Sequence, residues 1–213
     1  MITVKDRALT PNIKAIEELS RVFAKCGDPL IVIHGGGSFG HYWSVKYEMH
    51  TKPEMYDPRG ISVVHESMVA LNQIVVKSMS DAGLAPYGIS PISFFEDGVV
   101  NAAKFNELVE FTRRGILPVI FGEAVHIREG RFSIVSGDSL MTRIATHLMP
   151  SRVIFTVNVD GIYKDMKNKE LVKILNFPTN EISFKDSSID VTGGMGRKIS
   201  EAFEIAKLGI AVN

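Results

Sequence analysis

The sequence predicts an α/β fold in which a largely parallel, open sheet carries helices on both faces. Short apolar runs recur along the chain, and segments whose apolar residues follow helical spacing separate them. Runs that are apolar throughout are typical of parallel strands covered on both sides. The length of 213 residues and the hydrophobic content of 45% suit one large domain or two lobes that share a sheet.

Helix and strand signals alternate in the first half of the chain. The first predicted helix is capped by Thr10, begins at Pro11 and is stopped by Gly27, and a strand follows over Leu30–Ile33. A second helix is predicted over 62–82, where Gly83 ends it, and a second strand over Leu84–Ile89. The 62–82 helix carries an apolar stripe that suits either ordinary core or the wall of a ligand pocket. Its members are Val64, Met68, Leu71, Val75 and Met79.

The second half continues the alternation. It predicts a helix from Asn101 to Gly115, a strand over Leu117–Phe121, a hairpin of Val125–Ile127 with Phe132–Val135, a helix capped by Ser136 that runs to Leu148, a strand over Val153–Val157, a helix after Gly194 and a strand from Ile210. The best candidate for a boundary is Pro150-Ser151, which would divide the chain into lobes 1–150 and 151–213.

Composition excludes several classes of protein. The formal net charge is zero and no basic run is present, which argues against a nucleic-acid partner. Cys26 is the only cysteine, so an internal disulfide cannot form. No run approaches the roughly 20 apolar residues of a membrane span, and the N-terminus lacks the apolar core of a signal peptide. These features predict a cytoplasmic protein with no membrane partner.

The stretch His34–His41 is the most informative in the chain. Its four glycines are Gly35, Gly36, Gly37 and Gly40. They follow a strand and precede His41 and a predicted helix, where backbone amides can approach an anion and the helix adds its positive end. The stretch therefore predicts a phosphate cradle with an imidazole at its rim. The alternative is a tight turn that binds no ligand, for which a single glycine would be enough.

Two other phosphate motifs fit this stretch poorly. Gly35, Gly37 and Gly40 match the spacing of a dinucleotide fingerprint, which needs a second strand ending in an acid about 20 residues on. Prolines and a glycine interrupt the region 48–62 instead. A P-loop would close its glycine run with Lys-Ser or Lys-Thr, which this stretch lacks.

Three further stretches combine turn residues with charges. Ser136–Ser139 could bind an anion or simply cap a helix. Val157–Tyr163 follows a strand at its carboxyl end, where open α/β sheets bind ligands, or forms an Asp-Gly turn. Asp190–Lys198 is a second glycine-rich entry to a helix, in which Lys198 could reach a phosphate or remain solvated.

Together these motifs resemble those of the amino acid kinase superfamily, in the same order and over nearly the whole chain. The residues that carry the resemblance are His34–His41, Ser136-Gly137-Asp138, Val159–Tyr163 and Thr192–Lys198. The form ending in His41 is most similar to archaeal isopentenyl phosphate kinases. The resemblance implies a three-layer sandwich, an acceptor lobe over 1–150 and a nucleotide lobe over 151–213.

The resemblance also implies roles for individual residues. Those of the catalytic machinery are His41, Lys5, Asp138 and Lys198; those that bind the acceptor phosphate are Gly35, Gly36, Gly37, His41 and Gly137; those on the nucleotide side are Gly37, Asp160, Tyr163, Gly194 and Lys198. It further implies ATP with Mg²⁺, a phosphate-bearing small molecule as acceptor, and a homodimer.

The chain departs from the family pattern in three respects. The family opens with a strand and a Lys-x-Gly-Gly-Ser motif, and it continues beyond the position of Asn213. Ser139 and Asn158 stand where the pattern often has aspartate. We therefore expect that the first strand and a C-terminal segment are missing, and that the natural polypeptide starts upstream of Met1.

The chemistry implied is phosphoryl transfer to a phosphate monoester, which is largely a dianion at pH 7 and needs no general base. The expected reaction converts isopentenyl phosphate to isopentenyl diphosphate with ATP. The alternatives are a fosfomycin-type, acetylglutamate or UMP kinase of the same superfamily, and a non-catalytic ligand-binding regulator. A dinucleotide oxidoreductase ranks last.

Overall fold

A computed structural model of the chain describes residues 1–157, 159–165, 170–175 and 194–213. The chain separates into two compact units, Met1–Leu148 and Met149–Asn213. Each unit is described by itself below.

The first unit is built on a parallel sheet. Its strands are β1 (Val32–His34), β5 (Leu117–Phe121) and β2 (Pro86–Ile89), in the order β1-β5-β2. In the register, Val119 lies opposite Val32 of β1 and Gly88 of β2. Every residue of the central strand β5 is buried, as its continuous apolar sequence predicts.

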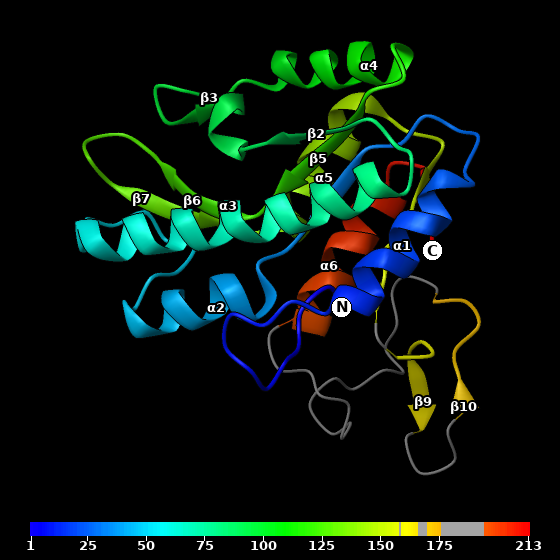
Figure 1. Cartoon of the computed structure of the whole chain (residues 1–213), viewed down its shortest axis with the longest axis horizontal. Helices are drawn as coiled ribbons and strands as arrows, with labels where there is room; N and C mark the ends of the chain where they lie inside the picture. The colour runs from blue at the N-terminus through cyan, green and yellow to red at the C-terminus, as the bar shows by residue number, and fades with distance from the viewer. Residues whose placement is uncertain (158, 166–169, 176–193) are drawn as a thin grey trace. The chain divides into compact units, whose positions relative to one another are not determined.

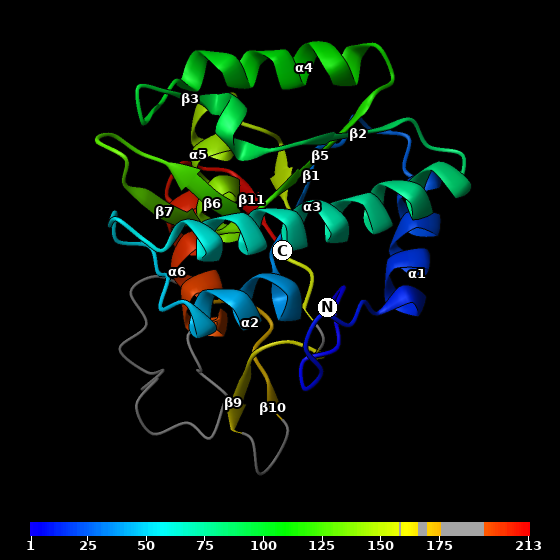
Figure 2. The same ribbon diagram turned by 60° about the vertical axis from the view of Figure 1, so that its left-hand side comes forward.

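Helices cover both faces of this sheet (Figures 1 and 2). Leu117 and Val119 pack with α1 (Ile13–Ala24) and α3 (Pro58–Asp81). The alternate residue Ile120 packs on the other face against α4 (Asn106–Arg113) and α5 (Gly137–Leu148). The predicted sheet with helices on both faces is thus confirmed.

The apolar stripe of α3 is core along its whole length. Val64, Met68, Leu71, Val75 and Met79 are each at most 3% exposed. Val75 and Met79 pack with Ile16 of α1 and with β5, so they do not line a pocket. Of the two alternatives for the stripe, the core is correct.

Smaller elements complete the first unit. They are α2 (Gly37–Lys46), the 3-10 helices η1 (Pro91–Phe94) and η2 (Ala102–Phe105), the short pair β3 (Phe95–Glu96) with β4 (Val99–Val100), and the hairpin β6 (Glu123–His126) with β7 (Phe132–Val135). The hairpin confirms the prediction, although β6 begins two residues earlier than expected.

The described residues of the second unit form two pairs of short strands and one helix. Its elements are β8 (Arg152–Val153) parallel to β11 (Ala211–Val212), β9 (Tyr163–Asp165) antiparallel to β10 (Glu170–Leu171), and α6 (Gly194–Ala206). The predicted strand Val153–Val157 is too long. Pairing ends where the Phe155 amide donates to Asn213, and Ile154 is 57% exposed.

Helix caps agree only partly with prediction. The Ser136 hydroxyl accepts from the Ser139 amide at 3.2 Å and caps α5 as expected. Asn101 caps η2, which leads into α4, so the predicted single helix is divided. Thr10 was expected to cap the first helix, but Asn12 does so, because its side-chain oxygen accepts from the Ala15 amide at 3.2 Å.

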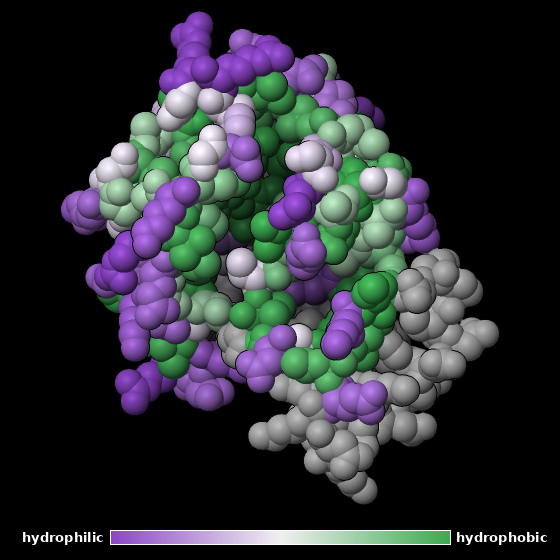
Figure 3. Space-filling model, turned by 90° about the vertical axis from the view of Figure 1, so that its right-hand side faces the viewer, coloured by the Kyte–Doolittle hydropathy of each residue, from purple (hydrophilic) through white to green (hydrophobic). Residues whose placement is uncertain are grey.

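No helix in the described part of the chain is long and apolar enough to cross a bilayer. On the face drawn in Figure 3, hydrophilic side chains are interspersed among hydrophobic ones.

The cap of α1 provides a test of the fold. We expect Asn12→Ala to lower the free energy of unfolding by about 1 kcal/mol, since an amide in the first turn loses its acceptor. Thr10→Ala is the matched control and should change it by less than about 0.5 kcal/mol, because the Thr10 hydroxyl donates to Ala8 and not to the helix. Urea denaturation measures both values, and a larger loss for Thr10→Ala would contradict this cap.

Candidate active site

The glycine-rich stretch forms the junction between β1 and α2. β1 ends at His34, and Gly36 is the N-cap of α2. Gly37, the first residue of the helix, has a φ of +47°. The loop therefore lies at the carboxyl end of a parallel strand and at the positive end of a helix, as a phosphate cradle requires.

Two of these glycines have no room for a side chain. A Cβ on Gly36 would lie 2.9 Å from the Gly40 Cα and 3.0 Å from the Met68 Sδ. A Cβ on Gly37 would collide with the side chain of Thr3. The glycines thus serve close packing as well as exposure of the backbone.

The N-terminal segment supports the start of α2. Thr3 is 3% exposed, and its hydroxyl oxygen accepts from the Ser38 amide at 3.1 Å. The chain then turns back, since the Val4 amide donates to Thr10 and the Leu9 amide to Ser38. Lys5 lies exposed in this turn, beside the helix start. Sequence analysis missed Thr3, because its contact is 35 residues away and no local pattern indicates it.

A second helix start meets the glycine loop. A Cβ on Gly137 would lie 2.9 Å from the His34 carbonyl oxygen and 3.1 Å from the Gly35 amide nitrogen. The Gly122 amide, just after β5, donates to the same His34 carbonyl at 3.0 Å. The structure therefore brings Gly35, Gly36, Gly37 and Gly137 together, with the N-termini of α2 and α5 converging on one place.

Asp138 follows Gly137 in the first turn of α5 and is half-buried. A carboxylate at this position is favoured by the helix dipole. It lies beside the glycine loop because its neighbour Gly137 packs against His34 and Gly35, and its expected role in organising cations stays a prediction.

His41 lies inside α2, which corrects the expectation that the helix begins after it. Gly37 is one turn earlier on the same face of the helix. Helical side chains lean toward the N-terminus, so the exposed imidazole of His41 covers the turn that contains Gly37. The imidazole at the rim of the cradle stays a prediction, now on a helical backbone.

A second imidazole, that of His34, is buried beneath the loop. Its Nδ1 lies 3.1 Å from the Gly35 carbonyl oxygen and its Nε2 lies 3.4 Å from the Asn72 Nδ2. The ring stacks on Phe121 with centroids 5.8 Å apart. Burial lowers the pKa of His34 to about 4, so the ring is neutral at pH 7.

A buried carboxylate next to the cradle was also missed from the sequence. Glu123 follows Gly122 and is 2% exposed. One of its oxygens accepts from the Ser90 hydroxyl and the other binds the His65 Nδ1. These partners come from α3 and from the end of β2, so only the fold reveals the network.

The predicted nucleotide-side residues lie in the second unit, except Gly37. Gly194 is the first residue of α6, and Lys198 lies one turn further on, with its Nζ 5.6 Å from the centroid of the Phe155 ring. Asp160 is exposed, and Tyr163 begins β9. Asn158 and residues 190–193 of the second glycine motif lie outside the described residues.

A family model for the amino acid kinase family matches residues 3–212. The chain belongs to the amino acid kinase family. It is 34% identical over 203 residues to an isopentenyl phosphate kinase of Thermoplasma acidophilum, covering 93% of this chain and 80% of the relative. It is 28% identical over 213 residues to an isopentenyl phosphate kinase of Methanothermobacter thermautotrophicus, and this match covers 91% of this chain and 80% of the relative. A crystal structure of the T. acidophilum enzyme as a product complex matches with a TM-score of 0.80 and 27% identity, covering 99% of this chain and 85% of that chain.

Two features of this amino acid kinase bear on the phosphate-bearing ligands that its sequence predicts. Gly35 and Gly37 are exposed at the loop, a Cβ on Gly36, Gly37 or Gly137 would collide with neighbouring protein atoms, and Lys198 lies on α6. Among the residues that the structure describes, no cluster of three His, Cys, Asp or Glu could hold a metal ion.

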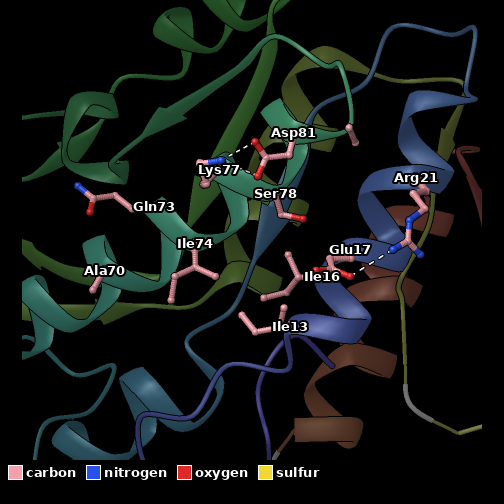
Figure 4. A pocket seen from close by; sticks show the side chains of 11 residues that line it. Ile13, Ile16, Glu17, Arg21, Ala70, Gln73, Ile74, Lys77, Ser78 and Asp81 are labelled. Atoms are coloured by element: carbon pink, nitrogen blue, oxygen red, sulfur yellow. Dashed lines mark hydrogen bonds and ion pairs between the residues drawn. The ribbon is translucent and has the colours of Figure 1, made fainter.

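A groove of about 760 Å³ lies elsewhere in this kinase, between α1 and α3 (Figure 4). Its floor includes Ile13, Ile16 and Ile74, and the ion pairs Glu17–Arg21 and Lys77–Asp81 stand at its rim. Within the described chain, none of the predicted site residues lines it. This groove is therefore not the predicted phosphate site.

The collision at Gly37 gives a stability test. We expect Gly37→Ala to lower the free energy of unfolding by at least about 1 kcal/mol, from the left-handed φ alone. Gly27→Ala is the matched control and should change it by less than about 0.5 kcal/mol, because nothing lies within 4 Å of its added Cβ. Thermal denaturation compares the two, and equal stabilities would contradict both the left-handed φ of Gly37 and its close contact with Thr3.

Proposed function

We propose that this chain phosphorylates isopentenyl phosphate with ATP to form isopentenyl diphosphate. The observation that carries the proposal is the convergence of the glycine loop with Gly137, together with His41 one turn into α2. This arrangement suits an acceptor that itself ends in phosphate. Family membership and relatives that are named isopentenyl phosphate kinase support the same reaction.

On the acceptor side, the glycine amides would orient the phosphate and His41 would donate a hydrogen bond to it. One oxygen of the acceptor dianion attacks the γ-phosphorus of ATP, the bond from that phosphorus to the β,γ-bridging oxygen breaks, and ADP leaves. No proton has to be removed from the acceptor, because its second pKa is near 6. The main contributions of the protein are positioning and charge neutralisation.

On the donor side, Lys198 and Lys5 would neutralise the ATP phosphates, with Asp138 orienting the lysines. Gly37, Asp160, Tyr163 and Gly194 would contact the nucleotide. Mg²⁺ carried by ATP would add charge to the same phosphates. In this proposal residues 1–150 form the acceptor lobe and residues 151–213 belong to the nucleotide lobe.

A panel assay tests the reaction directly. The chain is incubated with ATP and Mg²⁺ and, in separate reactions, isopentenyl phosphate, fosfomycin, UMP or N-acetylglutamate, and ADP release is measured. We expect turnover with isopentenyl phosphate to exceed the others. ATP binding without turnover of any acceptor would favour a ligand-binding regulator instead.

We further propose a cytoplasmic homodimer. The support for a dimer is membership of the family, and the support for the cytoplasm is the use of ATP as donor. Sedimentation equilibrium of the chain measures the first, and a monomer at micromolar concentration would contradict it.

His41 supplies the first prediction on activity. His41→Ala should lower kcat/KM for isopentenyl phosphate by at least about 10²-fold, the usual cost of one preorganised donor. His41→Gln should retain more activity, because a donor remains. The side chain is exposed, so the fold should tolerate both changes.

Val45→Ala is the matched control, because Val45 lies on the same helix and is 62% exposed. It should leave kcat/KM unchanged. Wild-type turnover by His41→Ala would remove the main support for a phosphate acceptor at this loop.

Lys198 supplies a prediction for the donor side. Lys198→Met should reduce kcat at saturating ATP by roughly 10²-fold or more while acceptor binding stays nearly intact, since charge neutralisation acts in the transition state. Lys207→Met, near the other end of α6, should keep the wild-type kcat. Steady-state kinetics with each substrate varied separates the two effects, and an unchanged kcat in Lys198→Met would exclude this role.

A further inference from the structure

Two side chains beneath the glycine loop are not used by the mechanism above. His34 is 7% exposed and Asn72 is 5% exposed, and they come from the end of β1 and the middle of α3. Both are polar groups in the core, where an unpaired donor or acceptor is costly. Their hydrogen bonds must therefore be identified before a role can be assigned to either side chain.

The contacts determine which ring nitrogen of His34 carries the proton. A carbonyl oxygen only accepts, so Nδ1 must be protonated to donate to Gly35 at 3.1 Å. In a neutral ring Nε2 is then bare and accepts from the Asn72 Nδ2 at 3.4 Å. The lowered pKa of His34, about 4, agrees with a neutral ring.

Asn72 is itself held in place by the sheet. A Cβ on Gly88 of β2 would lie 2.6 Å from the Asn72 Oδ1. The missing side chain at Gly88 thus leaves space for the carboxamide, whose other end faces His34.

The ring sets the direction of a peptide group in the cradle. In a trans peptide the carbonyl of one residue and the amide of the next point in opposite directions. When the Gly35 carbonyl turns toward the buried His34 ring, the Gly36 amide turns away from that ring. That amide precedes the first hydrogen bond within α2, so the helix offers it no carbonyl.

We propose that His34 and Asn72 are positioning residues for the acceptor phosphate. Asn72 orients the His34 ring, and the ring holds the Gly35 carbonyl so that the Gly36 amide faces the acceptor. This inference rests on the proposed function, because it assigns the Gly36 amide to the acceptor phosphate.

The first test is kinetic. Asn72→Leu removes the donor with little change in volume, and it should raise KM for isopentenyl phosphate about tenfold, the equivalent of one net hydrogen bond, while KM for ATP stays unchanged. His34→Asn keeps a donor near Gly35 and should retain more acceptor affinity than His34→Leu. Gly88→Ala should act like Asn72→Leu, because it displaces the carboxamide.

The control removes a buried hydrogen bond far from the loop. Ser20 is 1% exposed, and its hydroxyl donates to Ile16 at 2.9 Å and lies 3.0 Å from the Ser78 hydroxyl. Ser20→Ala should lower stability and leave both KM values unchanged. If folded Asn72→Leu also kept the wild-type KM for isopentenyl phosphate, the positioning role would be overturned.

A second test uses the wild-type protein and does not depend on activity. Nitrogen-15 NMR of the histidine rings should show Nδ1 of His34 protonated and Nε2 bare at pH 7, and the Gly36 amide resonance should shift when inorganic phosphate or isopentenyl phosphate is added. A proton on Nε2 with a bare Nδ1, or an unmoved Gly36 amide, would overturn the inference. Both signatures in a protein without kinase activity would instead contradict the proposed function alone.

Discussion

The architecture of the site depends on one close backbone contact. The His34 carbonyl at the end of β1 accepts from the Gly122 amide after β5, and a Cβ on Gly137 at the start of α5 would lie 2.9 Å from the same carbonyl oxygen. A side chain on Gly137 would push α5 away from β1. Because the three segments come from distant parts of the sequence, their contact holds the two helix starts together at the proposed phosphate site.

The strand order explains why this contact falls at the site. β5 is central and pairs with β1 in parallel, so the carboxyl ends of both strands lie at the same edge of the sheet. The two helices that begin there, α2 and α5, lie on opposite faces of the sheet, α2 against α3 and α5 with α4. Their dipoles therefore add at the edge between the layers, where a phosphate dianion gains most from them.

Local patterns in the sequence predicted those structural features that depend on residues adjacent in the chain. The buried strand Leu117–Phe121, the cap at Ser136 and the glycine loop were all evident, because each is determined by a few adjacent residues. The start of α2 was not evident from the sequence, because glycines have low helix propensity. The helix includes Gly37 and Gly40 because tertiary contacts stabilise it. Thr3, Asn72 and the bonded set of Glu123, His65 and Ser90 act across long sequence separations, and no spacing rule detects such contacts.

The hydrogen bond from the Ser38 amide to Thr3 has a thermodynamic consequence for the N-terminal segment. Thr3 accepts that bond from an amide in the first turn of α2, and in the proposed function the same backbone conformation would present the loop amides to an anion. Occupation of the loop and docking of residues 2–12 are then two equilibria that favour one state. By linkage, the free energy by which a bound anion stabilises the docked segment equals the free energy by which the docked segment increases the affinity for the anion.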